Sequence, residues 1–310
     1  MDQPLLSIVF ATRNRPTELE RAIASCYAQT YRPIEVLVYD DASTNDVDSV
    51  VRQFPGTRCT HASERQGSII LRNRGFGEAK GQYIVSLDDD AYFTESGTLQ
   101  CVVDQFQANP QCAIIALPLI EPETGSKTGL VQAGRAIPPG TPLRNYRGSA
   151  SVLNRARLLE AGAYRKELFH QSEERDLAIR IMNLGYTILM GDAPPVVHTP
   201  SPTRDRDALD RLGIRNSLLF DVWNIPHPYL CPRLAADMFR LLCYRLSFRN
   251  ALQRTRYLLH GLRECWRLRS LRHPVSLKTY RAYTQLGRHG PRLMPVDQLP
   301  APIRPANKPS

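Results

Sequence analysis

Three consecutive aspartates, Asp88 to Asp90, have the spacing in this sequence that most directly suggests chemistry. They follow segment 82–87, an apolar run with the character of a buried strand. Side chains two residues apart in an extended chain point the same way, so we expect Asp88 and Asp90 to project together. Two such carboxylates are typical ligands of Mg²⁺ or Mn²⁺, and that ion would neutralise a diphosphate. The alternative interpretation of a short D-x-D sequence is an acidic surface turn.

A second acidic group, Glu173 and Glu174, begins a predicted helix. Its apolar stripe runs over 177–184, and Ser172 is the expected N-cap. The helix dipole favours negative charge at this end, so we expect both glutamates to stay ionised. An ionised carboxylate beside an acceptor hydroxyl can take its proton. The alternative is helix capping with a surface ion pair made by Asp176.

The elements that must position these carboxylates follow from the periodicity of the chain. Short apolar runs alternate with helical spacing through the first ninety residues, which predicts a parallel sheet with right-handed crossovers. Further strands are expected later in the chain. The predicted strands are 5–11, 34–39, 57–61, 82–87, 113–119, 186–190 and the run beginning at 196; the predicted helices are 19–26, 47–54 and part of 67–81.

Polar residues stand at the ends of three of these strands. Thr12, Asp41 and the aspartates 88–90 each follow an apolar run. In an open parallel sheet, ligands bind beyond the carboxyl ends of the strands. We therefore expect these three clusters, distant in sequence, to share one crevice.

The chain resembles the family 2 glycosyltransferases, which have the GT-A fold, from residue 5 to about residue 200. Three stretches carry the resemblance: SIVFATRNRPTELERAIASCYAQTYRPIEVLVYDDASTND, LRNRGFGEAKGQYIVSLDDDAYF and SEERDLAIRIMNLGY. Their order and spacing make the match more specific than any one stretch. The resemblance implies an α/β fold with a Rossmann-like nucleotide-binding, mostly parallel central sheet.

The resemblance also implies roles for single residues at the nucleotide. Thr12, Asn14 and Asp41 match positions that line the base and ribose. Arg72 matches a position near the uracil or the phosphates, and Asp88 matches the ribose-binding member of the D-x-D motif.

Other roles implied by the resemblance concern the metal and the reaction. Asp88 and Asp90 match the metal-binding motif, and His198 matches a late histidine that completes the metal shell in some relatives. A satisfied structural histidine is the alternative for His198. Glu173 and Glu174 match an acidic pair near the acceptor that is usually Glu-Asp; the resemblance favours Glu174 as the catalytic base, with Glu173 as the alternative.

Composition divides the chain into three regions. We expect a catalytic domain over 1–225, a basic helical region over 226–290 and a Pro-rich, disordered tail over 291–310. Met238, Leu241, Leu242, Arg245 and Leu246, followed by Tyr257, Leu258, Leu262 and Trp266, suggest amphipathic helices with a basic face. Such helices either lie on an anionic membrane or form a cap packed on the catalytic core.

The length, net charge and cysteine content of the chain limit the classes of protein to which it can belong. Its 310 residues carry a net charge of +10, which suggests an anionic partner, but no nucleic-acid-binding module is recognisable. Seven cysteines without a C-x-x-C pair favour neither a disulfide framework nor a zinc site. Neither a signal peptide nor a membrane-spanning run is apparent, so we expect a cytoplasmic protein, either free or peripheral on the inner face of the plasma membrane.

Together these observations lead to one functional hypothesis and one alternative. The hypothesis is an inverting, metal-dependent glycosyltransferase of hexosyltransferase type that uses Mg²⁺ or Mn²⁺. It would transfer a sugar from a UDP- or dTDP-sugar to a hydroxyl acceptor in polysaccharide or glycolipid assembly. The alternative is a non-catalytic scaffold or binding subunit with the same fold, docked to a membrane by its basic C-terminal region.

Overall fold

The computed structural model describes residues 3–120, 137–199, 206–243 and 248–286. The predicted tail over 291–310 lies outside these residues, as do Arg245 and Leu246.

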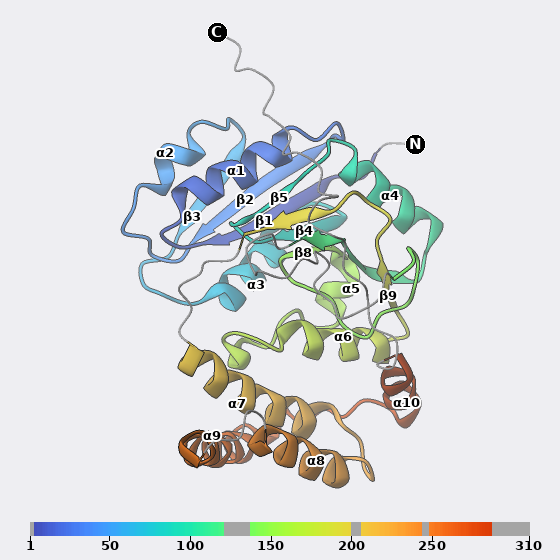
Figure 1. Ribbon diagram of the computed structural model, residues 1–310. Coiled ribbons are helices and arrows are strands. Elements are labelled where there is room, and N and C mark those ends of the chain that lie inside the picture. Colours follow the sequence, from blue (N-terminus) through green and yellow to red (C-terminus); the bar gives the residue numbers. More distant parts are fainter. Residues whose placement is uncertain (1–2, 121–136, 200–205, 244–247, 287–310) are drawn as a thin grey trace.

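A central α/β sheet organises the described part of the chain. It contains seven strands in the order β3-β2-β1-β4-β8-β6-β9, and all except β8 run parallel. The parallel arrangement aligns the carboxyl ends of β1, β2 and β4 at one edge (Figure 1). The strands are β1 (Leu6–Thr12), β2 (Ile34–Asp40), β3 (Thr57–His61), β4 (Tyr83–Leu87), β6 (Cys112–Ala116), β8 (Ala150–Asn154) and β9 (Thr187–Met190).

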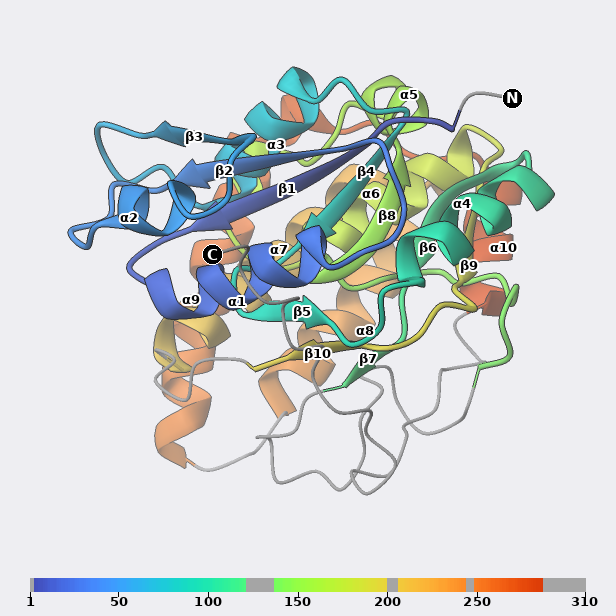
Figure 2. The same ribbon diagram turned by 90° about the horizontal axis from the view of Figure 1, so that it is seen from above.

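A smaller sheet lies beside the central one and is formed by β5 (Ala91–Phe93), β10 (Val196–His198) and β7 (Leu119–Ile120) (Figure 2). Its middle strand, β10, pairs antiparallel with β5, and His198 stands opposite Ala91. Because Ala91 directly follows the aspartates, this pairing brings His198 beside them from more than a hundred residues away in sequence.

Helices cover both faces of the central sheet because its strands alternate their side chains. Leu6, Ile8 and Phe10 of β1 enter one core cluster, with helices α1 (Pro16–Tyr27), α2 (Val47–Val51) and α4 (Thr98–Ala108). Val9 enters the other cluster, with α3 (Ser68–Glu78), α5 (Arg155–Glu160) and α6 (Glu173–Asn183).

A further helical layer packs below α6 (Figure 1). It consists of α7 (Arg206–Asn224), α8 (Leu230–Cys243) and α9 (Phe248–Arg267), while α10 (Leu277–Leu286) packs directly on α6. Helix α7 contacts α6 on one side and both α8 and α9 on the other. None of the helices in the described residues combines the length and apolar character needed to cross a bilayer.

The sequence predicted most strands of the central sheet but missed several elements, among them β5, α5, β8 and α7. The strand at 57–61 has the expected bounds, β10 begins at 196 as expected, and β1, β2, β4 and β9 differ from expectation by one residue at one or both ends. The single strand expected over 113–119 was wrong, because this segment forms two short strands, β6 and β7, in different sheets. Strand β8 was missed, since Ser149, Ala150 and Ser151 weaken its apolar signal. Helix α7 was also missed, and it begins well before residue 226, where the helical region was expected to start.

Asp176 is a buried structural residue. The ion pair expected for it is present, with Arg180, but the pair is buried and not at the surface, so that part of the interpretation was wrong. The Asp176 side chain is fully buried and lies 2.8 Å from the Arg180 guanidinium and 3.2 Å from that of Arg165. It also accepts a hydrogen bond of 2.8 Å from the amide of Asn224 at the end of α7. Asp176 therefore ties α6 to the helical layer below it.

We expect Asp176→Ala to lower the free energy of unfolding by about 3 kcal/mol, because it leaves buried guanidinium groups without their carboxylate. Urea unfolding followed by circular dichroism measures the change. Glu64, which is exposed, is the control, and Glu64→Ala should change stability by less than about 0.5 kcal/mol. A loss for Asp176→Ala no larger than that of the control would contradict the buried role.

Candidate functional site

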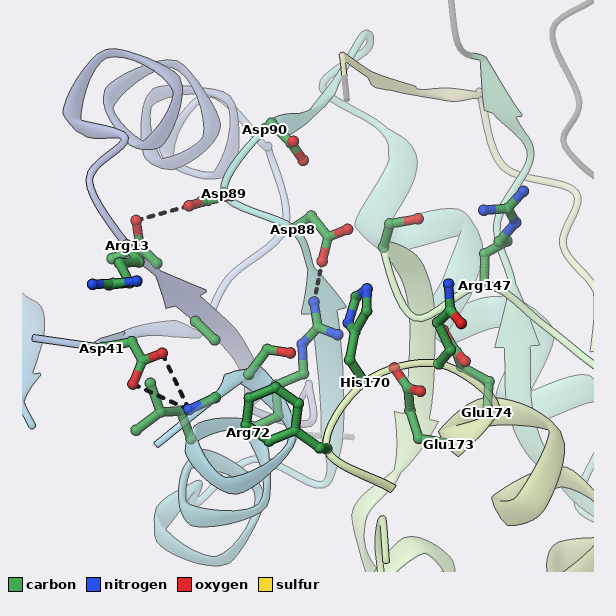
Figure 3. Close-up of a pocket in the computed structure, with 18 of the residues that line it drawn as sticks. Arg13, Asp41, Arg72, Asp88, Asp89, Asp90, Arg147, His170, Glu173 and Glu174 are labelled. Carbon is green, nitrogen blue, oxygen red and sulfur yellow. Dashed lines mark hydrogen bonds and ion pairs between the residues drawn. The ribbon is translucent and has the colours of Figure 1, made fainter. Parts of the chain in front are cut away.

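A cavity of about 690 Å³ opens at the carboxyl ends of β1, β2 and β4 (Figure 3). This volume lies within the usual range of ligand pockets. Its lining comes from the strand ends, from α3 and the start of α6, and from Ala208, Leu209 and Leu212 of α7. The lining includes Thr12, Asp41 and the aspartates 88–90, which confirms that these three clusters share one crevice.

Asp88, Asp89 and Asp90 form a tight turn rather than the end of an extended strand. Strand β4 stops at Leu87, and the amide of Ala91 donates to the carbonyl of Asp88 at 3.0 Å. Asp88 and Asp90 do converge as expected, but this turn and the pairing of β10 bring them together, not the alternation of a strand.

Asp89, the middle aspartate, stabilises the turn through its hydrogen bonds. It accepts a hydrogen bond of 2.8 Å from the Thr12 hydroxyl and one of 3.0 Å from the Arg15 guanidinium. Burial raises the pKa of Asp89 to about 6, although Arg15 opposes the shift. Thr12 therefore contacts the turn directly and joins the end of β1 to that of β4.

Asp88 and Asp90 each place one oxygen on an arginine and the other near His198. Asp88 pairs with Arg72 through Oδ1, and Asp90 lies 2.6 Å from Arg15 through Oδ2. The remaining oxygens, Asp88 Oδ2 and Asp90 Oδ1, are 3.5 Å and 3.1 Å from His198 Nε2. The two arginines thus orient the carboxylates so that one oxygen of each faces the histidine.

This arrangement fits a divalent cation. One ligand atom from each of Asp88, Asp90 and His198 lies within 4.8 Å of the others. Asp90 Oδ1 is buried and makes no hydrogen bond, although His198 Nε2 is close to it. A buried carboxylate oxygen without a hydrogen bond is costly unless a cation satisfies it. Carboxylate oxygens are the ligands that Mg²⁺ and Mn²⁺ favour.

Two more of the expected nucleotide residues lie in the cavity, and one does not. Asp41 accepts hydrogen bonds from the amides of Gln66 and Gly67, at 2.6 Å and 3.1 Å, and so fixes the start of α3. Arg72 is buried, and its charge holds the pKa of Asp88 below the ordinary value although burial opposes this. Asn14 is exposed, is not among the cavity residues, and accepts a hydrogen bond of 2.8 Å from the amide of Thr44.

Glu173 and Glu174 reach the cavity from the side opposite the aspartates (Figure 3). Glu174 is partly exposed and accepts a hydrogen bond of 3.1 Å from the amide of Gly148. Glu173 is buried, and one of its oxygens makes no hydrogen bond. Burial, reinforced by the charge of Glu174, raises the pKa of Glu173 to about 8.

The expectation that both glutamates stay ionised was therefore wrong for Glu173. At the first residue of a helix the dipole favours the charged form by about 1 kcal/mol, which is less than the cost of burying a carboxylate. At neutral pH Glu173 holds a proton, whereas Glu174 is the member of the pair that is open to the cavity.

The segment before the acidic pair is conformationally strained. Phe169, Gln171 and Ser172 have positive φ angles of 61°, 70° and 68°, although none is glycine. Ser172 occupies the N-cap position of α6, but its side chain makes no capping hydrogen bond, so the expected capping role was wrong. Strain of this kind costs about 1–3 kcal/mol per residue and is concentrated at functional sites.

Several cavity residues were missed by the sequence analysis. Arg15 contacts two of the three aspartates. It lies in the polar run after the first strand, and the arginines of this run were the pattern that could have indicated it. Arg13, Arg65, Arg147 and His170 also line the cavity. With Arg15, Arg72 and His198, this makes five arginines and two histidines around the cavity, which suits an anionic ligand such as a diphosphate.

Comparison with protein families gives a match to glycosyl transferase family 2 over residues 7–159. A curated relative, the UDP-Glc:alpha-D-GlcNAc-diphosphoundecaprenol beta-1,3-glucosyltransferase WfaP of Escherichia coli, is 33% identical over 91 residues. These are 29% of this chain and 36% of that protein. The chain spans about a third of the length of this and two other curated relatives that it matches.

Comparison with solved structures shows the GT-A glycosyltransferase fold. S. aureus TarS 1-349 in complex with UDP-GlcNAc is 14% identical with a TM-score of 0.62, covering 91% of each chain. The mannosyltransferase PcManGT from Pyrobaculum calidifontis, in complex with GDP-Man and Mn²⁺, is 17% identical with a TM-score of 0.58. That match covers 93% of this chain and 80% of PcManGT.

The raised pKa of Glu173 should make stability depend on pH. The folded state favours the protonated form of Glu173. The contribution of this group to the free energy of unfolding is therefore complete below about pH 4.5 and is lost as pH rises through about 8. We expect Glu173→Gln to remove this loss. The variant should therefore gain stability over the native protein between pH 5 and pH 8 by at least about 1 kcal/mol.

Urea unfolding of both proteins at a series of pH values, in the presence of EDTA, measures the difference. A constant difference from pH 5 to pH 8 would contradict the buried, protonated state of Glu173.

Proposed function

Because residues 7–159 of this chain belong to glycosyl transferase family 2, we propose that the protein transfers a sugar from a nucleoside diphosphate sugar to a hydroxyl acceptor with inversion at the anomeric carbon. The observation that carries the proposal is the convergence of Asp88, Asp90 and His198 across one cavity from Glu173 and Glu174. An inverting displacement needs this division, with the leaving group stabilised on one side and a base on the other.

The first side of the cavity suits the diphosphate. Asp88, Asp90 and His198 would hold Mg²⁺ or Mn²⁺, which when bound would stabilise the negative charge of the leaving diphosphate. Thr12 and Asp41 lie at the ends of β1 and β2, where the base and ribose would be placed. Asn14 accepts a hydrogen bond from Thr44, which holds the loop after β1, and it would affect nucleotide binding through this loop.

The second side suits the acceptor. Glu174 is the proposed base: its carboxylate takes the proton of the acceptor hydroxyl as that oxygen attacks the anomeric carbon. The bond from this carbon to the diphosphate oxygen breaks in the same step. Glu173 holds its proton at neutral pH and so acts as a neutral neighbour that does not repel Glu174.

The donor and acceptor classes follow from the relatives. WfaP acts with UDP-Glc on a diphosphoundecaprenol-linked sugar, and TarS was solved with UDP-GlcNAc. We therefore propose a uridine or thymidine diphosphate sugar as donor and a lipid-linked glycan as acceptor, in polysaccharide or glycolipid assembly.

We expect Glu174→Gln to lower the transfer rate by about 10²- to 10⁴-fold, because the variant cannot take the acceptor proton. UDP binding measured by calorimetry should stay near that of the native protein. Glu173→Gln is the matched control and should keep its rate within about tenfold, since glutamine resembles a protonated glutamate.

Nucleotide release with a panel of donor sugars, with and without Mn²⁺, measures the rates. If Glu173→Gln abolished transfer and Glu174→Gln did not, the base would be Glu173. No release from any donor would favour a non-catalytic scaffold.

We expect Asp90→Asn to weaken Mn²⁺-dependent UDP binding by roughly 100-fold or more, because it removes a metal ligand, and even outer-shell changes cost 10- to 100-fold. Calorimetric titration of UDP with Mn²⁺ and with EDTA measures the loss. Asp192→Asn, an exposed change on the same protein, should leave binding unaltered. Equal UDP affinity in native protein and Asp90→Asn would refute the metal assignment.

A further inference from the structure

Helix α9 carries a row of large apolar side chains on its exposed surface. Leu252, Leu259 and Trp266 are 56%, 62% and 70% exposed, and Phe239 on the neighbouring α8 is 70% exposed. No other large apolar side chain of the described residues is more than 44% exposed. Single exposed apolar residues are common, but a concentration on one layer marks an interaction surface.

The spacing places this row on one line of the helix. Leu252, Leu259 and Trp266 recur every seven residues, which is close to two full turns. The opposite side of α9 faces α7, where a Cβ on Gly261 would lie 2.8 Å from Leu218 Cδ1. This close approach fixes α9 against α7, so the exposed apolar row lies on the side of α9 away from α7. Helix α9 itself lies at the bottom of the molecule in Figure 1.

Arginines accompany the row. Arg256 and Arg263, both exposed, follow Leu252 and Leu259 by four residues each, so they lie next to the row on the same side of α9. Between residues 230 and 272 the sequence has ten arginines, no lysine and two acidic residues. These two, Asp237 and Glu264, are largely buried and paired with arginines.

We infer that this row, with its flanking arginines, is a membrane-contact face that binds the surface of an anionic lipid bilayer. Leucine and tryptophan side chains would enter the headgroup region while the arginines contact lipid phosphates. A nucleic acid would use the arginines but would leave the regular row of leucines and Trp266 in water. Charge and apolar exposure together therefore favour a bilayer.

The location of the face agrees with a lipid-linked acceptor. Helix α7 lines the cavity with Leu209 and Leu212 and packs on α9. Packed helices lie about 8–10 Å apart, so one helical layer separates the contact face from the cavity. This inference goes beyond the proposed function, and it can be tested without any sugar transfer.

Flotation of the full chain with vesicles tests the inference. The native protein should float with phosphatidylglycerol vesicles, float poorly with phosphatidylcholine vesicles, and lose binding as salt is raised. Leu252→Ser with Leu259→Ser and Trp266→Ser should weaken binding by at least about tenfold. Arg256→Gln with Arg263→Gln should weaken it by roughly 30-fold at low salt.

Matched controls are available elsewhere on the surface. Leu159→Ser with Leu184→Ser changes two leucines that are 40% and 41% exposed, and Arg52→Gln with Lys80→Gln removes two exposed positive charges. Both controls should float like the native protein, and thermal melting should show that all variants fold.

Several outcomes would overturn the inference. One is a native protein that fails to float with anionic vesicles, and another is an equal loss in the control variants. A third is a native dimer that the triple variant converts to a monomer without any vesicle binding, which would make the row an interface between two copies. Tight binding to DNA in place of vesicles would reassign the arginines to nucleic acid.

Discussion

The ion pairs of Arg15 and Arg72 allow several carboxylates to crowd around one cavity. Asp88, Asp89 and Asp90 are consecutive, and their mutual repulsion in a partly buried turn would oppose folding. Arg15 lies 3.0 Å from Asp89 and 2.6 Å from Asp90, while Arg72 pairs with Asp88. Because each arginine contacts a defined oxygen, the remaining oxygens of Asp88 and Asp90 face His198.

On the side proposed for the acceptor, the repulsion between neighbouring carboxylates is reduced in a different way. Glu173 and Glu174 have no arginine within ion-pair distance among the contacts of the described residues. Instead burial raises the pKa of Glu173 to about 8, which favours its neutral form and reduces the repulsion within the pair. The site therefore combines charge pairing on the side proposed for the diphosphate with protonation on the side proposed for the acceptor.

The sequence was informative about strand ends and uninformative about long-range pairing and burial. Thr12, Asp41 and Asp88 were placed at one edge because parallel strands end together, and that is where they lie. The position of His198 beside Asp90 depends on the pairing of β10 with β5, which no local pattern reveals. The protonation of Glu173 depends on burial, which residue type and helix position did not indicate.

The helical layer connects these observations because α7 belongs to both parts of the molecule. It lines the cavity through Leu209 and Leu212, and Asn224 at its end donates to the buried Asp176 of α6, the helix that carries both glutamates. On its other side α7 packs closely on α9 at Gly261. The cap interpretation is therefore correct for the inner faces of these helices, with Leu241 and Leu258 buried in the core. The outer face of α9 is a separate surface, so packing on the core and the proposed contact with a membrane would use opposite sides of the same helix.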